Sequence, residues 1–489
     1  MTSLSAQAIE REALRLLWAT LRLSLAPELQ SALAKDRARR ADAALARLVA
    51  GHAQLPQLRS DYYRRYEELL ERTRRLDPNF PTPEPAGAAA ADNPLFVGIP
   101  EIAAELEARL LAGATDGRQD DATAPALDAL IRDVVRLEAG CRLDYESRVL
   151  GMKPALGVAG GAARELTRES LQTYLRAHPR GSAEITVREV HEIPGGRSKR
   201  TVLAMLDVSA TLPPELVLRL DTARGVGTSV LDEFGLLDRV ARRGLPVPEP
   251  LWLEGSAEAF GQPFIVFRRM PGAAAGDLIE GAFRKEPRTA RALAWALGRV
   301  HGRGAELIED PTQRGSAVPH TRALLDRYRE WWRRKKPFPS LIIETAFLWL
   351  YRGLDRGLGE ATVVHADTAF HNLLLDEAGT PCLLDWEFAH FGDPAEDLAS
   401  CRPAVEKCMP WPEFMAEYQR AGGRPVSAFR LNFFEIWRPL RNAVVCGTTL
   451  HSMMSGDADD IDPVTIATST FQRLQADLAR SLDGLIDGQ

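Results

Sequence analysis

The sequence predicts an α+β protein with a helical first part, a middle segment of short strands, and a helical remainder that contains one further hairpin. Three observations predict this class. Before about residue 76, apolar residues recur at spacings of three and four, which is the period of an amphipathic helix. Between about residues 185 and 271, short apolar runs suited to strands are separated by glycine and proline. From about residue 290 the helical period returns and dominates.

The length and composition indicate a soluble protein of more than one domain. A chain of 489 residues is too long for one ordinary core, and two or three domains are expected. We divide it into a helical accessory module at 1–150, a strand-rich lobe at 151–271 and a helical lobe at 272–489. The net charge is −6, and no apolar run approaches the ~18 residues of a membrane helix. We therefore expect neither nucleic acid nor a membrane as a partner.

The cysteines and the N-terminus predict a cytoplasmic protein. The first ten residues lack the basic, apolar and small-residue order of a secretion signal. The cysteines are odd in number, widely spaced and without a CxxC pair, which favours reduced thiols over disulfides or a zinc site. They are Cys141, Cys382, Cys401, Cys408 and Cys446.

The first 150 residues predict helices and contain no cluster of catalytic side chains. Two loose connections interrupt them, a linker rich in proline and alanine at 77–94 and a polar linker at 113–125. We interpret this part as a module for homo-oligomerisation or for a protein partner, and the sequence does not decide between them. Its first apolar face is formed by Leu14, Leu17, Leu21 and Leu25.

The strand-rich lobe begins with a predicted hairpin. A strand through Ile185 and Val190 and its partner at Thr201–Val208 are joined by the turn Pro194-Gly195-Gly196-Arg197-Ser198. Lys199 follows this turn and could reach a bound phosphate, although an exposed turn cation is the ordinary interpretation.

The next elements place a cation beside an acid. Glu215–Leu220 predicts a strand that carries Arg219, and a helix from about Thr228 to Arg242 carries Glu233 one turn from its start. Glu233 could pair with Arg219, or it could be a surface residue favoured by the helix dipole. Two more strands follow, and the second runs into Met270-Pro271-Gly272.

The helical lobe contains a basic cluster beside aromatic residues. Residues 320–357 predict helices rich in tryptophan, tyrosine and phenylalanine, and aromatic side chains at helical spacing are usually core. The adjacent cations leave room for an anionic acceptor that carries a phosphate or coenzyme A. They are Arg333, Arg334, Lys335 and Lys336.

One polar constellation follows these helices. His365-x-Asp367-x4-Asn372 lies between a strand end and a short strand at 373–375, and the returning strand ends at Asp385. This spacing is typical of phosphoryl-transfer sites, in which the first aspartate meets the attacking hydroxyl. Asn372 and Asp385 supply oxygen ligands of the kind that Mg²⁺ prefers. Because both lie at the ends of one hairpin, we expect their separation to be fixed.

These residues, with Asp385-Trp386-Glu387 and Gly392-Asp393-Pro394 beyond them, resemble the aminoglycoside phosphotransferase family of protein-kinase-like small-molecule kinases. The motif Asp-Trp-Glu-x-Ala-His-x-Gly-Asp-Pro is most similar to that of the branch related to the kinase-like domain of acyl-CoA dehydrogenase fusion proteins. The resemblance implies a two-lobed protein-kinase-like fold with an additional all-helical N-terminal module. It also implies ATP and Mg²⁺ as cofactors and a small-molecule hydroxyl as the acceptor, on the closest branch a hydroxyacyl-CoA-type metabolite.

The resemblance implies a role for each site residue. Asp367 is the catalytic residue, Asn372 and Asp385 hold the metal, His365 is structural, Asp397 braces the loop, and Glu387 assists the metal shell. In two places the sequence departs from the family: Arg219 stands where kinases use lysine, and Ala366 stands where glycine is more frequent. Ala366 is unfavourable there only if the position requires a positive φ. The nucleotide-binding residues implied are Gly195, Gly196, Ser198, Arg219, Glu233 and Met270.

Three functions remain open from the sequence. The first is a kinase for a metabolite hydroxyl, the second is an antibiotic kinase of the aminoglycoside or macrolide type, and the third is a nucleotide-binding pseudokinase that serves as an interaction module. The intact set of Asp367, Asn372 and Asp385 argues against the third, and Arg219 in place of lysine argues for it. The sequence does not identify the acceptor, nor whether ATP or GTP is preferred.

Overall fold

The computed structural model describes ten ranges of the chain, together with single helical positions between residues 18 and 75. The linker at 77–94, most of the linker at 113–125, and Gly195, Gly196 and Ser198 lie outside the described residues. The ranges are 124–147, 166–193, 199–209, 211–221, 228–277, 283–310, 314–336, 340–454, 466 and 470–486.

The chain forms two compact units. Unit 1 gathers residues within 1–158, 324–355 and 436–489, and unit 2 comprises 159–323 and 356–435. This grouping differs from the three ranges predicted from the sequence, because the helices at 324–355 and 436–489 belong with the first 158 residues. The predicted division at residues 150 and 271 therefore stays a prediction.

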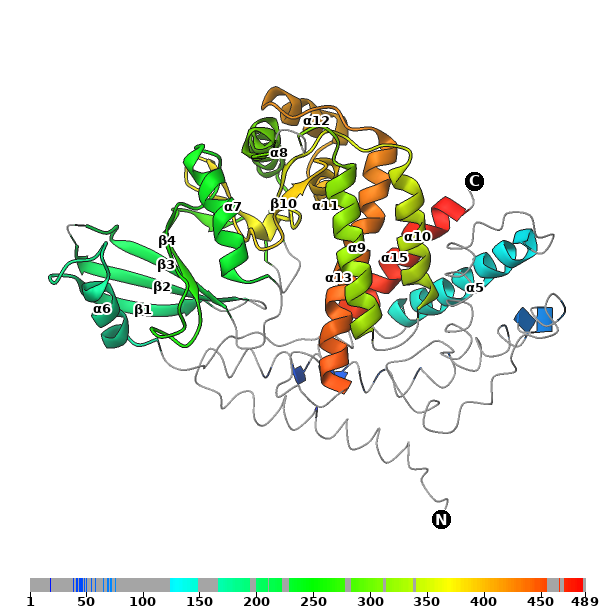
Figure 1. Cartoon of the computed structure of the whole chain (residues 1–489), viewed down its shortest axis with the longest axis horizontal. Coiled ribbons are helices and arrows are strands. Elements are labelled where there is room, and N and C mark those ends of the chain that lie inside the picture. The colour runs from blue at the N-terminus through cyan, green and yellow to red at the C-terminus, as the bar shows by residue number, and fades with distance from the viewer. Residues whose placement is uncertain are drawn as a thin grey trace, which may run out of the picture. The chain divides into compact units, whose positions relative to one another are not determined.

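Unit 2 begins with a five-stranded antiparallel sheet in the order β1-β2-β3-β5-β4, and Figure 1 shows α6 beside β1 and α7 beside β4. All of the strands predicted in this region are present, and β2 begins at Lys199, two residues before its predicted start. The bounds are β1 Thr186–Ile193, β2 Lys199–Val208, β3 Glu215–Asp221, β4 Pro250–Glu254, β5 Phe264–Arg268, α6 Arg168–Ala177 and α7 Val230–Arg242.

The two faces of this sheet have different chemistry because side chains alternate along a strand. Val202, Ala204, Leu216 and Leu218 are buried in one core cluster that also contains Leu171 of α6. Side chains of the opposite parity on β2 and β3 face α7. In register across this pair, Lys199 lies opposite Asp221 and Thr201 lies opposite Arg219. Two cations and a carboxylate therefore share the face that α7 covers.

The start of α7 is fixed to this face by a side-chain cap. Ser229 is the N-cap residue and accepts a hydrogen bond from the backbone N–H of Leu231. The Asp221 carboxylate accepts hydrogen bonds from the Ser229 hydroxyl at 2.6 Å and from the backbone N–H of Val230 at 3.0 Å. Glu233, in the first turn of α7, is thereby placed near β3.

A single short segment joins the sheet to the helical part of unit 2. After β5 the chain passes through Met270 and Gly272 into β6 (Ala273–Ala274), which pairs with β8 (Leu373–Leu375). Gly272 has φ +117°, and a Cβ atom there would lie 2.3 Å from the Leu375 carbonyl oxygen, so only glycine fits. This arrangement of a sheet, a hinge and a helical part confirms the predicted α+β, two-lobed kinase-like fold.

The helical part of unit 2 contains two small sheets, a three-stranded one in the order β6-β8-β9 and the pair β10-β7. β8 pairs with β9, and β7 pairs with β10. The helix α8 buries leucine, alanine and valine side chains and ends beside β7, with α12 packed along it. The bounds are α8 Pro287–Gly304, β7 Thr362–Val364, β9 Pro381–Leu383, β10 His390–Gly392, α11 Ala395–Val405 and α12 Trp411–Arg420.

Unit 1 has only helices as regular secondary structure in its described residues. Helices α5, α10 and α15 pack against one another, and the Glu138 carboxylate of α5 accepts hydrogen bonds at the start of α10 from the Ser340 hydroxyl and the Ile342 backbone N–H. This agrees with a helical accessory module, and its role stays a prediction. The bounds are α5 Ala124–Tyr145, α9 Val318–Lys335, α10 Leu341–Leu354, α13 Ala428–Met454 and α15 Phe471–Ile486, of which α9 and α13 contribute to both units.

The predicted basic cluster lies in the last turn of α9, where a helix dipole favours cations. Arg333 and Lys335 are exposed, and Arg334 pairs with Glu330 at 2.6 Å. The contact predicted between this basic cluster and an anionic acceptor stays a prediction. Among the described helices, none combines the length and apolar character needed to cross a bilayer.

Candidate active site

A buried carboxylate organises the loop after β7. Asp397, at the start of α11, accepts hydrogen bonds from the backbone N–H groups of His365 at 2.8 Å and Ala366 at 2.7 Å, and from the Thr368 hydroxyl at 2.6 Å. His301, near the end of α8, contacts the same carboxylate through Nε2 at 2.9 Å. The bracing role predicted for Asp397 is thus visible in its contacts.

The surroundings of Asp397 favour its ionised form. Burial alone raises the pKa of this carboxyl, but the hydrogen bond and charge of His301, with smaller contributions from His365 and Thr368, outweigh burial and hold the pKa well below its ordinary value. A depressed pKa means that the carboxylate stabilises the folded state above the ordinary aspartate pKa of 3.8. That contribution is lost as the pH falls below this value.

We expect Asp397→Asn to destabilise unit 2 by about 3–5 kcal/mol at pH 7, since it removes a buried charge that several donors require. Urea unfolding of the variant and the wild type between pH 7 and pH 3 measures the effect. The difference between the two proteins should shrink as the pH falls below about 4, because the wild-type carboxylate then loses its advantage. A difference that does not vary with pH would contradict this role.

Ala366 adopts the left-handed backbone conformation that its sequence position left in question. Its φ is 64°, and its side chain is buried. A Cβ atom in this region costs roughly 1–2 kcal/mol, and glycine avoids that cost while losing more chain entropy on folding. The alanine is tolerated because its backbone N–H is held by Asp397 at 2.7 Å.

Substitutions at residue 366 should therefore depend sharply on side-chain shape. Ala366→Gly is expected to change the free energy of unfolding by less than about 1 kcal/mol, since strain relief offsets lost burial and chain entropy. Ala366→Val is expected to destabilise by at least about 2 kcal/mol, because a β-branched residue is strained at positive φ and no space is open to it. Urea unfolding of both variants tests this, and equal stabilities would contradict it.

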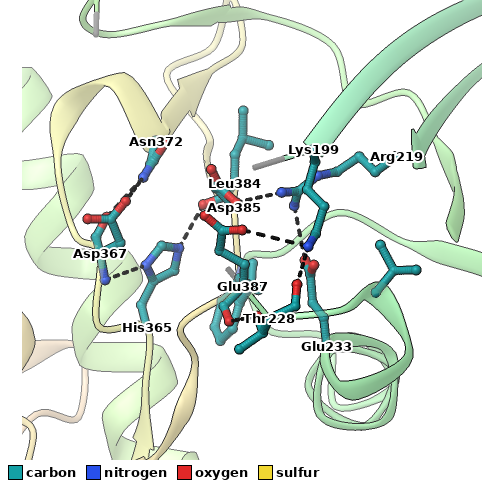
Figure 2. Close-up of polar contacts among 12 residues, drawn as sticks. Lys199, Arg219, Thr228, Glu233, His365, Asp367, Asn372, Leu384, Asp385 and Glu387 are labelled. Carbon is teal, nitrogen blue, oxygen red and sulfur yellow. Dashed lines mark hydrogen bonds and ion pairs between the residues drawn. The ribbon is translucent and has the colours of Figure 1, made fainter. Parts of the chain in front are cut away.

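Asp367 and Asn372 are held together at the mouth of the hairpin (Figure 2). The Asn372 side-chain N–H₂ donates to the Asp367 backbone carbonyl at 2.9 Å and to its carboxylate Oδ2 at 3.0 Å. The backbone N–H of Leu384 donates to the Asn372 carbonyl at 2.8 Å, which places Asp385 next to the same hairpin end. With its nitrogen facing Asp367, the Asn372 amide oxygen is the atom suited to a hard cation.

His365 links the loop to the returning strand. Its Nε2 contacts the Leu384 carbonyl at 2.7 Å, and its Nδ1 accepts from the Asp367 backbone N–H at 3.3 Å. Since a carbonyl can only accept, Nε2 carries a proton and donates it to the Leu384 carbonyl. These contacts support the structural role predicted for His365.

Arg219 connects the sheet to Asp385. Its guanidinium donates to Glu233 at 3.0 Å, so the ion pair expected from the sequence is present, and also to Asp385 at 2.6 Å. Burial raises the pKa of Asp385, but the Arg219 guanidinium outweighs this and lowers it below its ordinary value. Burial also raises the pKa of Glu233, which shares the same cation. Asp385 has φ 64°, a conformation that aspartate adopts more readily than most residues.

Sequence reasoning missed the position of Lys199. Its side chain is only 4% exposed, and Nζ lies 3.0 Å from Asp221 and 3.9 Å from Glu387, so it is not an exposed turn cation. The ammonium also donates to the Thr228 carbonyl. One sequence signal could have indicated this position. Arg219 and Asp221 are two residues apart and so lie on the same face of β3, and the neighbouring strand β2 begins with a lysine.

Met270 and Glu387 are the remaining predicted site residues within the described ranges. Gly195, Gly196 and Ser198 lie outside the described residues. Met270 is half-buried in the segment between β5 and β6. Glu387 is buried and lies near Lys199, and its expected role in the metal shell stays a prediction.

The charges of the site suit a divalent cation. On the described residues no group of three or more His, Cys, Asp or Glu side chains forms a metal cluster. Magnesium does not require one, since it is commonly held by one or two carboxylates and phosphate oxygens. Lys199 and Arg219 face more carboxylates than they can neutralise. These are Asp221, Glu233, Asp385 and Glu387.

A comparison with known protein families identifies the family of this chain. The model of the phosphotransferase enzyme family matches residues 189–433, half of the chain, and this range contains every site residue described above. The chain belongs to the phosphotransferase enzyme family. The match confirms the family resemblance of the polar motif and makes the protein a relative of small-molecule phosphotransferases.

Two larger proteins are each similar to part of this chain. Acyl-CoA dehydrogenase family member 10 of Mus musculus is 27% identical over 176 residues, which is 35% of this chain and 16% of that protein. Acyl-CoA dehydrogenase family member 11 of Rattus norvegicus is 24% identical over 176 residues, 34% of this chain and 22% of that protein. The chain thus spans less than a quarter of either relative.

A solved choline kinase of Streptococcus pneumoniae resembles the chain at 17% identity and a TM-score of 0.44. The matched region covers 64% of this chain and 98% of the choline kinase. Similarity at this level carries no information about the substrate.

Proposed function

We propose that this chain is an ATP- and Mg²⁺-dependent phosphotransferase that transfers the γ-phosphate to a hydroxyl of a small molecule. One observation carries the proposal: hydrogen bonds bring Asp367, Asn372 and Asp385 to the mouth of a single hairpin. This set provides one proton acceptor and two oxygen ligands, which is what phosphoryl transfer requires of a protein.

In the proposed reaction, Asp367 positions the acceptor hydroxyl and takes its proton. The acceptor oxygen forms a bond to the γ-phosphorus, the bond from this phosphorus to the bridging oxygen breaks, and ADP keeps the electron pair. Asn372 keeps the Asp367 carboxylate oriented through its 3.0 Å hydrogen bond. Asn372 and Asp385 would hold Mg²⁺, whose chemistry there is to offset phosphate charge. Positioning and electrostatics supply most of the acceleration.

The nucleotide is proposed to lie between the sheet and the hairpin. Gly195, Gly196 and Ser198, between β1 and β2, would cover its phosphates with backbone N–H groups. The Arg219–Glu233 pair, observed at 3.0 Å, would fix the sheet and α7 around the phosphates. Met270, at the hinge between β5 and β6, would lie near the base.

For the acceptor we propose a hydroxylated acyl-CoA-type metabolite. The support is the similarity to two proteins that are named acyl-CoA dehydrogenase family members, over 35% and 34% of this chain. The proposal concerns only the metabolite class on which a kinase of this branch would act.

The test is a measurement of ADP release with a panel of hydroxyacyl-CoAs, sugars, choline, aminoglycosides and macrolides, with and without Mg²⁺. We expect Mg²⁺-dependent ADP release with hydroxyacyl-CoAs, and mass spectrometry of the product should show one added phosphate. Release with an aminoglycoside or macrolide alone would assign the antibiotic-kinase function instead. Nucleotide binding without release for any acceptor would contradict the proposal and indicate a pseudokinase.

A further inference from the structure

Lys199 is a buried cation for which the reaction outlined above has no use. It is the first residue of β2 and follows directly on residues 194–198, the turn proposed to cover the phosphates. Its ammonium lies 3.0 Å from Asp221 and 3.9 Å from Glu387, and its side chain is 4% exposed. A lysine is seldom buried to this extent unless it is paired, and here its charge lies between two carboxylates.

Arg219, the cation predicted to bind phosphate, is already occupied within the protein. One guanidinium nitrogen donates to Glu233 at 3.0 Å and another donates to Asp385 at 2.6 Å. Both of its partners are carboxylates that the site requires. A guanidinium that spans these two groups holds α7 and the hairpin in position, and only its remaining N–H groups could reach a phosphate.

Lys199 and Arg219 project from adjacent strands toward the same place. Lys199 is in register with Asp221, and Thr201 is in register with Arg219, so the two cations are diagonal neighbours on one face of the sheet. Figure 2 shows both side chains directed toward Asp385 and Glu387. The lysine is a compact charge on a flexible four-carbon stem, so it can move to a new anion more easily than the bidentate arginine.

We propose that Lys199 is the phosphate-binding cation of this site, contacting the α- and β-phosphates of the nucleotide while Arg219 has the positioning role. The two tasks that one lysine performs in protein kinases are then divided between two residues on two strands. The proposal rests on the proposed function, because it assumes that a nucleotide binds here. A purely structural role, in which Lys199 only anchors the start of α7 through Asp221 and Thr228, is the alternative that the experiment must separate.

The experiment compares Lys199→Met, Lys199→Arg and the matched control Arg200→Met by calorimetry with adenosine and with ADP plus Mg²⁺. Arg200 is the next residue of β2, on the opposite face, and pairs with Glu192 at 2.9 Å. We expect Lys199→Met to weaken ADP binding by about 10- to 100-fold, the size of a charged hydrogen bond, and to leave adenosine binding unchanged. Lys199→Arg should restore part of the loss, and Arg200→Met should bind both ligands like the wild type.

A double variant, Lys199→Met with Asp221→Asn, keeps the test decisive if the single variant is unstable. It removes both charges of the pair, so it should unfold at a higher temperature than Lys199→Met but remain equally weak for ADP. Wild-type ADP affinity in Lys199→Met or in the double variant, or equal losses for adenosine and ADP, would overturn the role of Lys199. Absence of ADP binding by the wild-type protein would instead overturn the proposed function, and this inference with it.

Discussion

Replacing Asp367 by asparagine is expected to lower kcat by about 10²- to 10⁴-fold, the usual contribution of a positioned proton acceptor. The asparagine side chain has nearly the same shape as aspartate but cannot take the proton from the hydroxyl of the acceptor. The KM for ATP should change little, because the Asp367 carboxylate contacts Asn372 rather than the proposed phosphate site. Steady-state ADP release with the acceptor found in the panel measures both constants.

Glu377→Gln is the matched control for this variant. Glu377 is exposed in the turn of the same hairpin, so the substitution removes a nearby carboxylate without touching the site. Its kcat should equal that of the wild type, and the unfolding temperatures of both variants should lie within a few degrees of the wild type. Wild-type turnover by Asp367→Asn would remove the proton acceptor from the account.

Asp385→Asn is expected to lower kcat by about 10²- to 10⁴-fold as well, but for a different reason. The substitution removes one proposed metal ligand, and metal-ion charge stabilisation amounts to several kcal/mol in the transition state. Its signature is a dependence on Mg²⁺ concentration: the variant should need far more Mg²⁺ for half-maximal activity, whereas Asp367→Asn should need no more than the wild type. Titration of ADP release with Mg²⁺ distinguishes the two.

The matched control for Asp385→Asn is Glu233→Gln, which also removes a charged partner of Arg219. Arg219 pairs with both carboxylates, so each variant leaves it one partner. Only Asp385 is a proposed metal ligand, so Glu233→Gln should keep the wild-type Mg²⁺ dependence. Equal shifts of the Mg²⁺ dependence in both variants would indicate that Asp385 acts through Arg219 and not through the metal.

The sequence predicted those parts of the site that depend on local structure. Asp367, Asn372 and Asp385 lie on one short hairpin, so their residue types and spacing were enough to expect them together. The Arg219–Glu233 pair follows from a strand and the next helix along the chain, and it is present at 3.0 Å. The α+β class and the strands of unit 2 were predicted for the same reason, because alternation and helical periods are local patterns.

What the sequence left unpredicted depends on long-range packing and on strand register. Asp385 meets Arg219 across 166 residues, and His301 meets Asp397 across 96 residues. Lys199 was misjudged because its face is set by the pairing of β2 with β3, in which it lies opposite Asp221. A shift of one residue would turn its side chain to the other face, and the spacing of Arg219 and Asp221 on β3 indicates that register without fixing it.

Local sequence patterns also could not predict which helices pack together. Amphipathic periods predict that the helices at 324–355 and 436–489 exist, and they do. The periods do not say which apolar faces meet, and in the structure these helices cluster with the first 158 residues rather than with the rest of the predicted helical lobe. Such choices depend on the packing of distant side chains.

The most direct test of the account is a crystal structure with Mn²⁺ and a non-hydrolysable ATP analogue, in which anomalous scattering locates the metal. We predict one strong peak within about 2.2 Å of both the Asn372 amide oxygen and an Asp385 carboxylate oxygen, a typical distance for hard divalent cations. Asp385 should bind the metal through Oδ2, while its Oδ1 atom keeps the 2.6 Å contact with Arg219. A nucleotide-bound structure whose metal contacts neither residue would contradict the account.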